Sequence, residues 1–371
     1  MPTKYQNNPD DEKILDEVAS HLETRIKAWY GDGTKLLHSQ PEVRSYPSSF
    51  FLCYTISKTD ESKVNLLIKI RRHPYIETLA QTKTIEGIHD KMHLEYDALK
   101  SVYESMGGMA NKNLGAIRPL EYFQPLNAII MEEVSAVTLG ELLEDFEKKI
   151  TGRRKRFAAI LDAAEKAGCW LRLFHHDVHE AGEIIFSSSE FMQNVERLTD
   201  KIDSSKDNLF SRHINKIFSA AAKKLENSPM YFSIGHGDMT SDNVLYKDGK
   251  VFLIDIKSER APTYLDLGLL LTHREIFIWQ VLSFGLSMPS KYTRKYQNAI
   301  IRGYFANGIQ KHTALLHLYC ALQILDKWAM YERIFSTRKG VKRIIAMILN
   351  PIFKLYFLTK TNSYIKKVYS E

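Results

Sequence analysis

The segment of the chain over residues 236–255 most constrains the possible fold. Residues 236–243 read HGDMTSDN, and residues 251–255 read VFLID. Apolar runs over 244–246 and 251–254 flank the polar residues 247–250 (KDGK), and this pattern is a strong signal for a hairpin turn. We therefore predict a β-hairpin that folds back and brings Asp255 close to Asp238 and Asn243.

These residue types suit the transfer of a phosphoryl group. Such a transfer depends on positioning and charge neutralisation more than on covalent help from the protein. Mg²⁺ prefers oxygen ligands, such as a carboxylate and an amide oxygen. A second carboxylate is needed to accept the proton of the acceptor hydroxyl. Asp238 suits the role of the base, and Asn243 and Asp255 suit the role of magnesium ligands.

The same segment resembles the aminoglycoside phosphotransferase and choline kinase family, which is related to the protein kinases. The resemblance rests on HGDMTSDN and on residues 253–268, LIDIKSERAPTYLDLG. It implies a catalytic base at Asp238 and metal ligands at Asn243 and Asp255. It also implies that His236 braces the catalytic loop and that Asp266 supports it. ATP or GTP and Mg²⁺ are the implied cofactors.

The implied fold is α+β, a two-lobed protein-kinase-like fold with a small N-terminal sheet lobe and a larger helical C-terminal lobe. Hydrophobic periodicity predicts helices over 10–30 and 93–106 and strands over 50–57, 64–70, 116–123 and 128–134. The pattern turns helical from residue 138, with a polar helical region from about 180 to 228 and a short strand over 231–234. We expect a nucleotide-binding lobe with a leading helix (1–131), a hinge (132–137), a catalytic and acceptor-binding lobe (138–330) and a basic amphipathic tail (331–371).

Residues upstream of the catalytic segment match the family in order. Lys69 lies in the predicted strand LLIKI, where the family holds a basic residue to the α- and β-phosphates, and Glu95 lies on the next helix, where the family pairs a glutamate with it. Taken alone, Lys69 fits an edge-strand lysine and Glu95 fits a solvated helix residue, whereas the pair in this order favours nucleotide binding. The resemblance adds Met131, Glu132 and Val134 at the purine, and Ser48 and Ser49 in a phosphate-covering turn, RSYPSS, that lacks the usual glycine.

Two other functions compete with this interpretation. The glycine-free turn is compatible with a catalytically weak, pseudokinase-like binding or scaffold protein. A protein kinase is disfavoured, because only ten residues separate Asp255 from Asp266 and no activation segment ending in Ala-Pro-Glu fits between them.

The histidines over 175–180 (HHDVHE) have spacings that zinc can use, but a helix end with histidines in its last turn is the simpler interpretation, and we assign no metal there.

The uneven distribution of charge along the chain indicates which charge the acceptor carries. Residues 271–371 hold 16 Lys and Arg against 4 Asp and Glu, whereas residues 1–270 hold 35 against 40. A basic C-terminal region argues against a cationic acceptor of the aminoglycoside or choline type, which stays an alternative. It favours an anionic acceptor, or a sugar of a lipid-linked or cell-envelope glycan. Solvated helix faces explain the same charges equally well.

In residues 331–371, basic residues alternate with aliphatic and aromatic ones. This composition suits a segment that lies on an anionic membrane surface. The alternative is a terminal helix packed on the large lobe, with Ile344, Ile348, Ile352 and Phe357 in its core. The apolar run over 344–358 is too short to span a bilayer. We expect no nucleic acid partner.

Cysteine usage and the first residues bear on the compartment. Cys53, Cys169 and Cys320 are far apart and show no CxxC spacing, which fits a reducing compartment. Residues 1–13 have no apolar core of the kind found in a secretory signal. We expect a cytoplasmic protein, with peripheral contact to the inner face of the membrane if the tail is interfacial.

Overall fold

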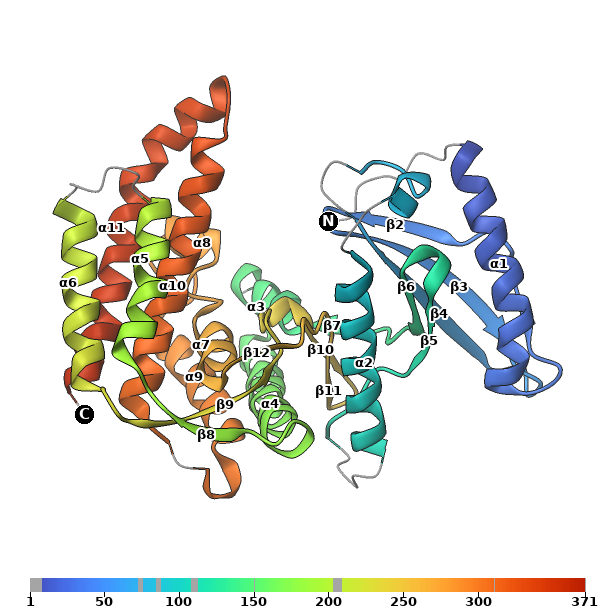
Figure 1. Cartoon of the computed structure of the whole chain (residues 1–371), viewed down its shortest axis with the longest axis horizontal. Helices are drawn as coiled ribbons and strands as arrows, with labels where there is room; N and C mark the ends of the chain where they lie inside the picture. Colours follow the sequence, from blue (N-terminus) through green and yellow to red (C-terminus); the bar gives the residue numbers. More distant parts are fainter. Residues whose placement is uncertain are drawn as a thin grey trace. The chain divides into compact units, whose positions relative to one another are not determined.

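The computed structural model describes residues 9–72, 76–84, 88–107, 113–149, 151–202, 209–309 and 311–370. The chain forms two compact units, Met1–Ala136 and Val137–Glu371. Their boundary falls within residues 132–137, the segment expected as a hinge. The N-terminal unit is built on a sheet, and the C-terminal unit is mainly helical (Figure 1).

An antiparallel sheet organises the N-terminal unit. Its strand order is β1-β3-β4-β6-β5, and β2 pairs with β3. The strands are β1 (Lys35–Leu36), β2 (Glu42–Tyr46), β3 (Ser49–Ser57), β4 (Lys63–Arg71), β5 (Pro119–Phe123) and β6 (Ala128–Glu132), with short 3₁₀ turns at Ala80–Thr84 and Gln124–Leu126. The strands predicted over 50–57, 64–70, 116–123 and 128–134 are all present with small shifts at their ends.

Two helices pack on this sheet. The helix α1 (Pro9–Tyr30) buries Leu15 and Leu22 in a cluster with the even-numbered residues of β3 and β4, such as Leu52 and Ile68. Because side chains alternate along a strand, odd-numbered Lys69 points to the other face. The helix α2 (Ile88–Gly107), which contacts β5 and β6, begins five residues before the predicted start at residue 93. The predicted helix stop at Gly107-Gly108 falls partly outside the described residues.

The C-terminal unit combines helices with two three-stranded sheets. The sheets have the orders β11-β10-β7 and β12-β9-β8, from β7 (Val137–Thr138), β8 (Gly182–Ile185), β9 (Pro229–Gly235), β10 (Val244–Lys247), β11 (Lys250–Leu253) and β12 (Glu259–Pro262). The helices are α3 (Leu139–Lys148), α4 (Arg153–Arg172), α5 (Ser188–Ile202), α6 (Leu209–Lys224), α7 (Thr263–Thr272), α8 (Ile278–Leu282), α9 (Ser290–Tyr304), α10 (Thr313–Ser336) and α11 (Val341–Tyr369).

The close packing of α4 on α9 positions part of the site. A Cβ atom on Gly303 would lie 1.9 Å from the carbonyl oxygen of Glu165, and one on Gly168 would lie 2.2 Å from that of Ile300. Only glycine allows the two backbones to approach this closely. This contact brings Tyr304, at the end of α9, to His175 in the π-helical turn (Leu173–Val178) that follows α4.

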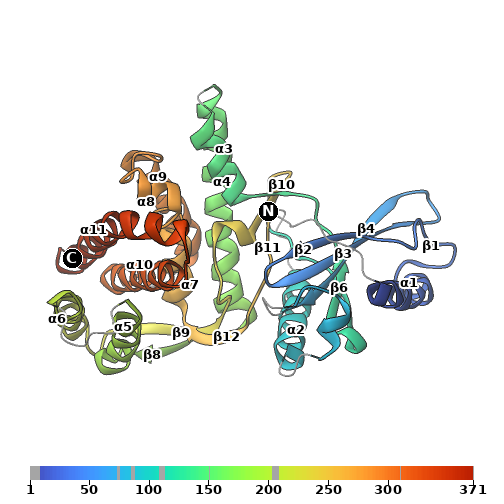
Figure 2. The same ribbon diagram turned by 90° about the horizontal axis from the view of Figure 1, so that it is seen from above.

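The segment expected as a tail is partly packed. The helix α10 continues to Ser336, and α11 lies beside it in both ribbon views (Figures 1 and 2). From Phe353 onward α11 is packed, because Phe353 and Phe357 are buried and Phe357 stacks on Trp328 with ring centroids 6.0 Å apart. Ile344 and Ile348, in the first half, are exposed.

Cys53, Cys169 and Cys320 are all free thiols. Over the parts of the chain that the structure describes, no helix combines the length and the apolarity needed to cross a bilayer.

Candidate active site

The predicted catalytic loop follows β9 and is fixed from two sides. The pairing of β9 with β12 places Gly235 opposite Glu259, and the Lys257 amide donates to the His236 carbonyl at 2.8 Å. On the other side, the predicted hairpin is present as β10 and β11, with Val244 opposite Leu253. The Ile254 amide donates to the Asn243 carbonyl at 3.1 Å. The hairpin therefore returns the chain to the loop, as predicted.

Asp266, at the start of α7, accepts hydrogen bonds from the loop backbone. Its carboxylate accepts the His236 amide at 2.6 Å and the Gly237 amide at 2.9 Å. His175 Nε2 lies 3.1 Å from the same carboxylate, and His175 Nδ1 lies 2.9 Å from the Tyr304 hydroxyl. Burial opposes the charge on Asp266, but the contact with His175 and the nearby His236 outweigh it, and the pKa of Asp266 is lowered. His175 is thus a brace for Asp266, with both ring nitrogens engaged.

The His236 side chain lies against the backbone of the predicted catalytic loop, and its role as a brace stays a prediction. The ring is fully buried, and its Nδ1 accepts the Asp238 amide at 3.3 Å. Burial lowers the pKa of His236, although Asp266, Asp238 and Asp255 all raise it electrostatically. The neutral ring therefore holds the loop from inside the unit and is shielded from any acceptor.

Asp238, the predicted base, faces a lysine. Lys257 Nζ lies 3.1 Å from Asp238 Oδ2, and the two side chains are 40% and 39% exposed. Gly237 makes this contact possible, because it has φ +75° and a Cβ atom there would lie 3.0 Å from Lys257 Cβ. Lys257 was not singled out from the sequence, since nothing in its immediate sequence distinguishes it from a surface lysine.

The two predicted metal ligands flank this loop. Asn243 Nδ2 donates to the Asp238 carbonyl at 2.8 Å, so the nitrogen is engaged and the amide oxygen is the atom suited to a cation. Asp255 follows β11 with φ +61°, a left-handed conformation that is unusual outside glycine. Among the described residues, no group of three His, Cys, Asp or Glu side chains is placed to hold a metal ion. Two protein oxygen ligands fit Mg²⁺, which commonly takes its remaining ligands from water and substrate phosphates.

In the N-terminal unit, the structure brings together the pair expected from the order of residues. Lys69 Nζ lies 2.6 Å from Glu95 Oε1, and the side chains are only 7% and 6% exposed. Lys69 comes from β4 and Glu95 from α2, so the pair ties the helix to the sheet. The structure thus assembles this pair, and its role at the phosphates stays a prediction.

The expected phosphate-covering turn is a tight β-hairpin turn between β2 and β3. Ser48 is exposed in the turn, and Ser49 is buried at the start of β3. The Ser48 carbonyl accepts the Arg72 amide at 2.9 Å. The exposed Ser48 is therefore the better placed of the two serines to meet a ligand.

In the segment expected at the purine, some backbone amides already form hydrogen bonds within the N-terminal unit. Met131 is buried, the Glu132 amide donates to the Arg118 carbonyl at 3.0 Å, and the Glu133 amide donates to the Asn65 carbonyl at 2.8 Å. The Glu132 side chain accepts from the Tyr30 hydroxyl at 2.7 Å. The backbone amide of Val134, the last of the residues expected at the purine, donates in none of these hydrogen bonds.

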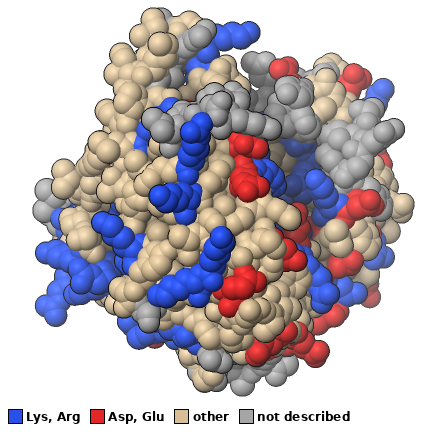
Figure 3. Space-filling model, turned by 60° about the vertical axis from the view of Figure 1, so that its left-hand side comes forward, with Lys and Arg blue, Asp and Glu red and all other residues tan. Residues whose placement is uncertain are grey.

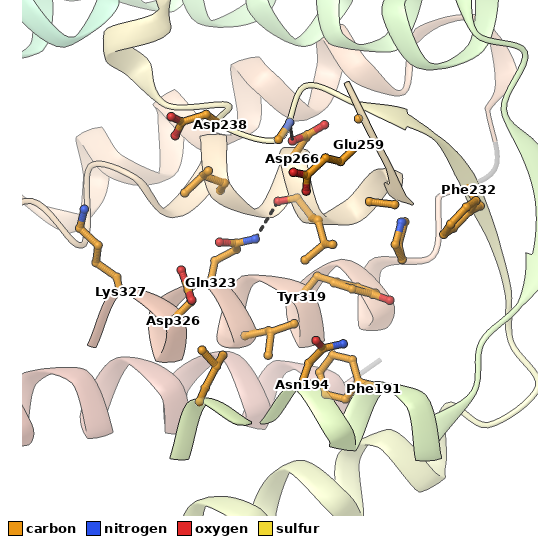
Figure 4. A pocket seen from close by; sticks show the side chains of 18 of the residues that line it. Phe191, Asn194, Phe232, Asp238, Glu259, Asp266, Tyr319, Gln323, Asp326 and Lys327 are labelled. Carbon is orange, nitrogen blue, oxygen red and sulfur yellow. Dashed lines mark hydrogen bonds between the residues drawn. The ribbon is translucent and has the colours of Figure 1, made fainter. Parts of the chain in front are cut away.

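A pocket opens beside Asp238 within the C-terminal unit (Figure 4). Its volume is about 540 Å³, and β9, β12, α5, α7 and α10 all contribute to its lining. Asp238, Asp326 and Lys327 lie at one end, whereas Phe232 lies at the other, and Tyr319, Phe191, Asn194 and Gln323 line the space between. Pockets of this size that combine aromatic walls with a few polar groups typically bind small molecules.

Comparisons with known proteins bear on the fold. No family model matches the sequence, and no curated protein matches it either. Among solved structures, a glucosamine kinase in complex with glucosamine, ADP and inorganic phosphate is 12% identical, with a TM-score of 0.54 over 94% of this chain and 86% of that chain. An amicoumacin kinase in complex with AMP-PNP, Ca²⁺ and Ami is also 12% identical, with a TM-score of 0.50 over 94% of this chain and 96% of that chain. The predicted fold is confirmed, because this chain shares the kinase-like fold of these small-molecule kinases.

Proposed function

We propose that this protein is a phosphotransferase that uses ATP or GTP to phosphorylate a hydroxyl group of a small molecule or glycan. The observation that carries the proposal is the position of Asp238, at the end of a pocket large enough for a small molecule. The neighbours of known structure add support, since one is a glucosamine kinase and another an amicoumacin kinase.

In the proposed step, the Asp238 carboxylate accepts the proton of the acceptor hydroxyl. The hydroxyl oxygen then bonds to the γ-phosphorus as the bond from that phosphorus to the β,γ-bridging oxygen breaks, and the nucleoside diphosphate leaves. His236, Asp266 and His175 hold the backbone of the loop in one conformation, so only the Asp238 side chain has to turn to the acceptor. Lys257 supplies a positive charge at the base that offsets charge on the transferring group.

The remaining residues take part in binding the nucleotide. Asn243 and Asp255 would hold Mg²⁺, which supplies neutralisation of phosphate charge when it is bound. Lys69, oriented by Glu95, binds the α- and β-phosphates, and Ser48 covers the phosphates. The backbone amide of Val134 is the donor for the purine edge, beside Met131.

A labelled nucleotide provides the direct test. Purified protein is incubated with Mg²⁺ and γ-labelled ATP or GTP and a panel of hydroxylated acceptors, and transfer of label is measured beside the Asp238→Asn variant. We expect transfer that needs Mg²⁺ and is lost in the variant. Nucleotide binding without transfer to any acceptor or to cell extract would instead favour the alternative, a pseudokinase-like binding protein. Preferential transfer to cationic acceptors would favour an aminoglycoside or choline type of kinase.

We also propose that the first half of α11 contacts an anionic lipid surface. Large apolar side chains project from it, including Met347, which is 67% exposed, and Ile348, which is 66% exposed. Arg338 and Lys339 lie exposed just before the helix. The tip where α10 meets α11, at the top left in Figure 3, is mostly uncharged surface with lysine and arginine near it. Basic and apolar groups together match the charge and the apolar interior of such a surface.

Vesicle binding tests this contact. Full-length protein should bind vesicles of phosphatidylcholine and phosphatidylglycerol, and not vesicles of phosphatidylcholine alone. Binding should weaken with salt, because exposed charges are screened over about 10 Å at 0.1 M. Ile348→Glu should abolish binding, whereas Leu94→Glu, at a similarly exposed leucine of α2, should leave it unchanged. Equal binding by Ile348→Glu and the parent protein would refute the contact, and the phosphotransferase proposal would remain.

A further inference from the structure

Lys327 on α10 places an unusual positive charge in the pocket. The side chain lines the pocket and is partly buried, and its Nζ lies 5.8 Å from the centroid of the Tyr331 ring. No ion pair joins it to a carboxylate of the described residues. Burial lowers the pKa of Lys327. Nearby carboxylates oppose this shift, and Asp238 has the largest effect among them. The ammonium is therefore partly desolvated without the close partner that normally compensates for desolvation.

Three other buried or half-buried cations of this unit have such partners. Arg274 pairs with Glu147, and Lys360 pairs with Glu275 at 2.5 Å. Lys257, the pocket cation closest to the base, is engaged by Asp238 at 3.1 Å. Lys327 differs from these three in having no ion pair with the described residues, so a bound anion would supply the close negative charge that the nearby carboxylates do not.

The position of Lys327 restricts which part of a ligand it meets. Lys327 and Asp238 lie at the same end of the pocket (Figure 4). An acceptor whose hydroxyl reaches Asp238 therefore has its neighbouring substituents beside Lys327. A carboxylate or phosphate at that place would be repelled by Asp238 and Asp326 unless a cation offsets them. The aromatic residues Phe191, Phe232 and Tyr319 provide flat apolar walls for the rest of the molecule.

On the basis of the phosphotransferase function proposed above, we infer that the acceptor is a hydroxylated acid, with a carboxylate or phosphate next to the reacting hydroxyl, and that Lys327 binds this anionic group. Lys327 is then a residue that determines specificity. The acceptor gives its hydroxyl proton to Asp238 and keeps its anionic group throughout. Lys327 changes neither its bonds nor its charge.

Matched ligands test this inference by direct binding and by transfer. The probes are glucuronate, glucose 6-phosphate, glucose and glucosamine, which share a hexose ring and carry a carboxylate, a phosphate, no charge and a positive charge. Calorimetry with the intact protein gives an affinity for each, and labelled ATP with Mg²⁺ gives transfer. We expect glucuronate or glucose 6-phosphate to bind about 10- to 100-fold more tightly than glucose, as expected for a hydrogen bond between charged groups. Comparing the two anions distinguishes the carboxylate from the phosphate.

Three variants assign the preference to this residue. Lys327→Met keeps the aliphatic stem and should remove the preference, Lys327→Arg keeps the charge and should retain most of it, and Lys216→Met, on the exposed face of α6, should leave it unchanged. Equal, absent or reversed preference among the four probes would overturn the inference, as would an equal loss for all four in Lys327→Met. Preferential binding of an acid without any transfer from ATP would refute the phosphotransferase and leave the anion site standing.

Discussion

Two lysine–carboxylate pairs, one in each unit, differ in the degree to which water reaches them. Lys69 and Glu95 are 7% and 6% exposed with 2.6 Å between their charged atoms, whereas Lys257 and Asp238 are 40% and 39% exposed with 3.1 Å between theirs. Lys69 and Glu95 join β4 to α2, whereas Lys257 and Asp238 join the loop after β11 to the loop after β9. Their contributions to stability and to chemistry should nevertheless differ, because the cost of removing a partner depends on burial.

A buried pair is fixed, and an exposed pair can exchange partners. Removing one member of a buried pair leaves an uncompensated charge in a poorly solvated place, whereas water and salt replace a lost partner at the surface. Lys69–Glu95 therefore suits a permanent arrangement of β4 and α2. Lys257–Asp238 suits a site in which the carboxylate must turn to an acceptor and the ammonium to a phosphate. Variants of each pair can break or sharpen this contrast.

The largest expected effect is on turnover in Asp238→Asn. Loss of a general base lowers the rate by roughly 10²- to 10⁴-fold, while nucleotide binding should stay nearly intact because the side chain acts on the acceptor. The melting temperature should hardly change, since the ion pair that is lost is half exposed. Single-turnover transfer, nucleotide affinity and thermal unfolding are measured together.

Asp248→Asn, in the exposed turn between β10 and β11, is the matched control. Asparagine tolerates the left-handed conformation found there, so this variant should behave like the parent protein. Turnover of Asp238→Asn within threefold of the parent would exclude Asp238 as the base.

Breaking the buried pair should cost the most stability. Lys69→Ala leaves the Glu95 charge buried and should lower the free energy of unfolding by about 3–5 kcal/mol. It should also weaken productive binding of the nucleoside triphosphate, and Glu95→Ala should do so more mildly, since Glu95 only orients the lysine. Chemical denaturation and nucleotide titration give both quantities. The double variant should be little worse than Lys69→Ala, and fully additive losses would show that the two side chains act independently.

Local sequence patterns predicted much of the site. The hairpin signal of residues 244–254 was enough to return Asp255 to the loop, because a short turn fixes the register of both strands. The meeting of Lys69 with Glu95 followed from their order in a family resemblance. The brace formed by Asp266 was likewise expected.

Contacts that depend on long-range packing could not be predicted from the sequence. Tyr304 reaches His175 because Gly168 and Gly303 let α4 and α9 come together, and no local pattern encodes that approach. Lys257 meets Asp238 through the pairing of β12 with β9. The short strand β8 (Gly182–Ile185) lay in a region that we expected to be helical, and its extended conformation comes from pairing with β9. Both the exposed start of α11 and its packed remainder mix basic and apolar residues, so only the tertiary structure tells them apart.

The contact between His175 and Asp266 is fully buried, and it makes stability depend on pH. Asp266 has its pKa lowered below the ordinary 3.8, mainly through His175, and against the effect of burial. The resulting stabilisation is present above pH 3.8 and is lost as the pH falls through the lower folded pKa. Asp266→Asn should lose charge-assisted hydrogen bonds worth about 1.5–3 kcal/mol each at pH 7. Urea denaturation of both proteins between pH 7 and pH 3 should show their stabilities converging with acid, and a constant difference would contradict this role.

The smallest expected effect on stability is that of Lys257→Met, and it tests the exposed side of the comparison most directly. Exposed ion pairs contribute about 0–1 kcal/mol, and methionine keeps the stem that packs on Gly237, so the free energy of unfolding should change by less than 1 kcal/mol. Turnover should still fall about tenfold, equivalent to 1.36 kcal/mol in the barrier, because the charge acts on the transferring phosphoryl group. Lys257→Arg should recover most of this loss, whereas Lys250→Met, at an exposed position of β11, should match the parent protein. Two results would contradict the contrast between the pairs. A loss of stability as large as that of Lys69→Ala would make Lys257–Asp238 a structural pair, and unchanged turnover would leave its ammonium without a part in phosphoryl transfer.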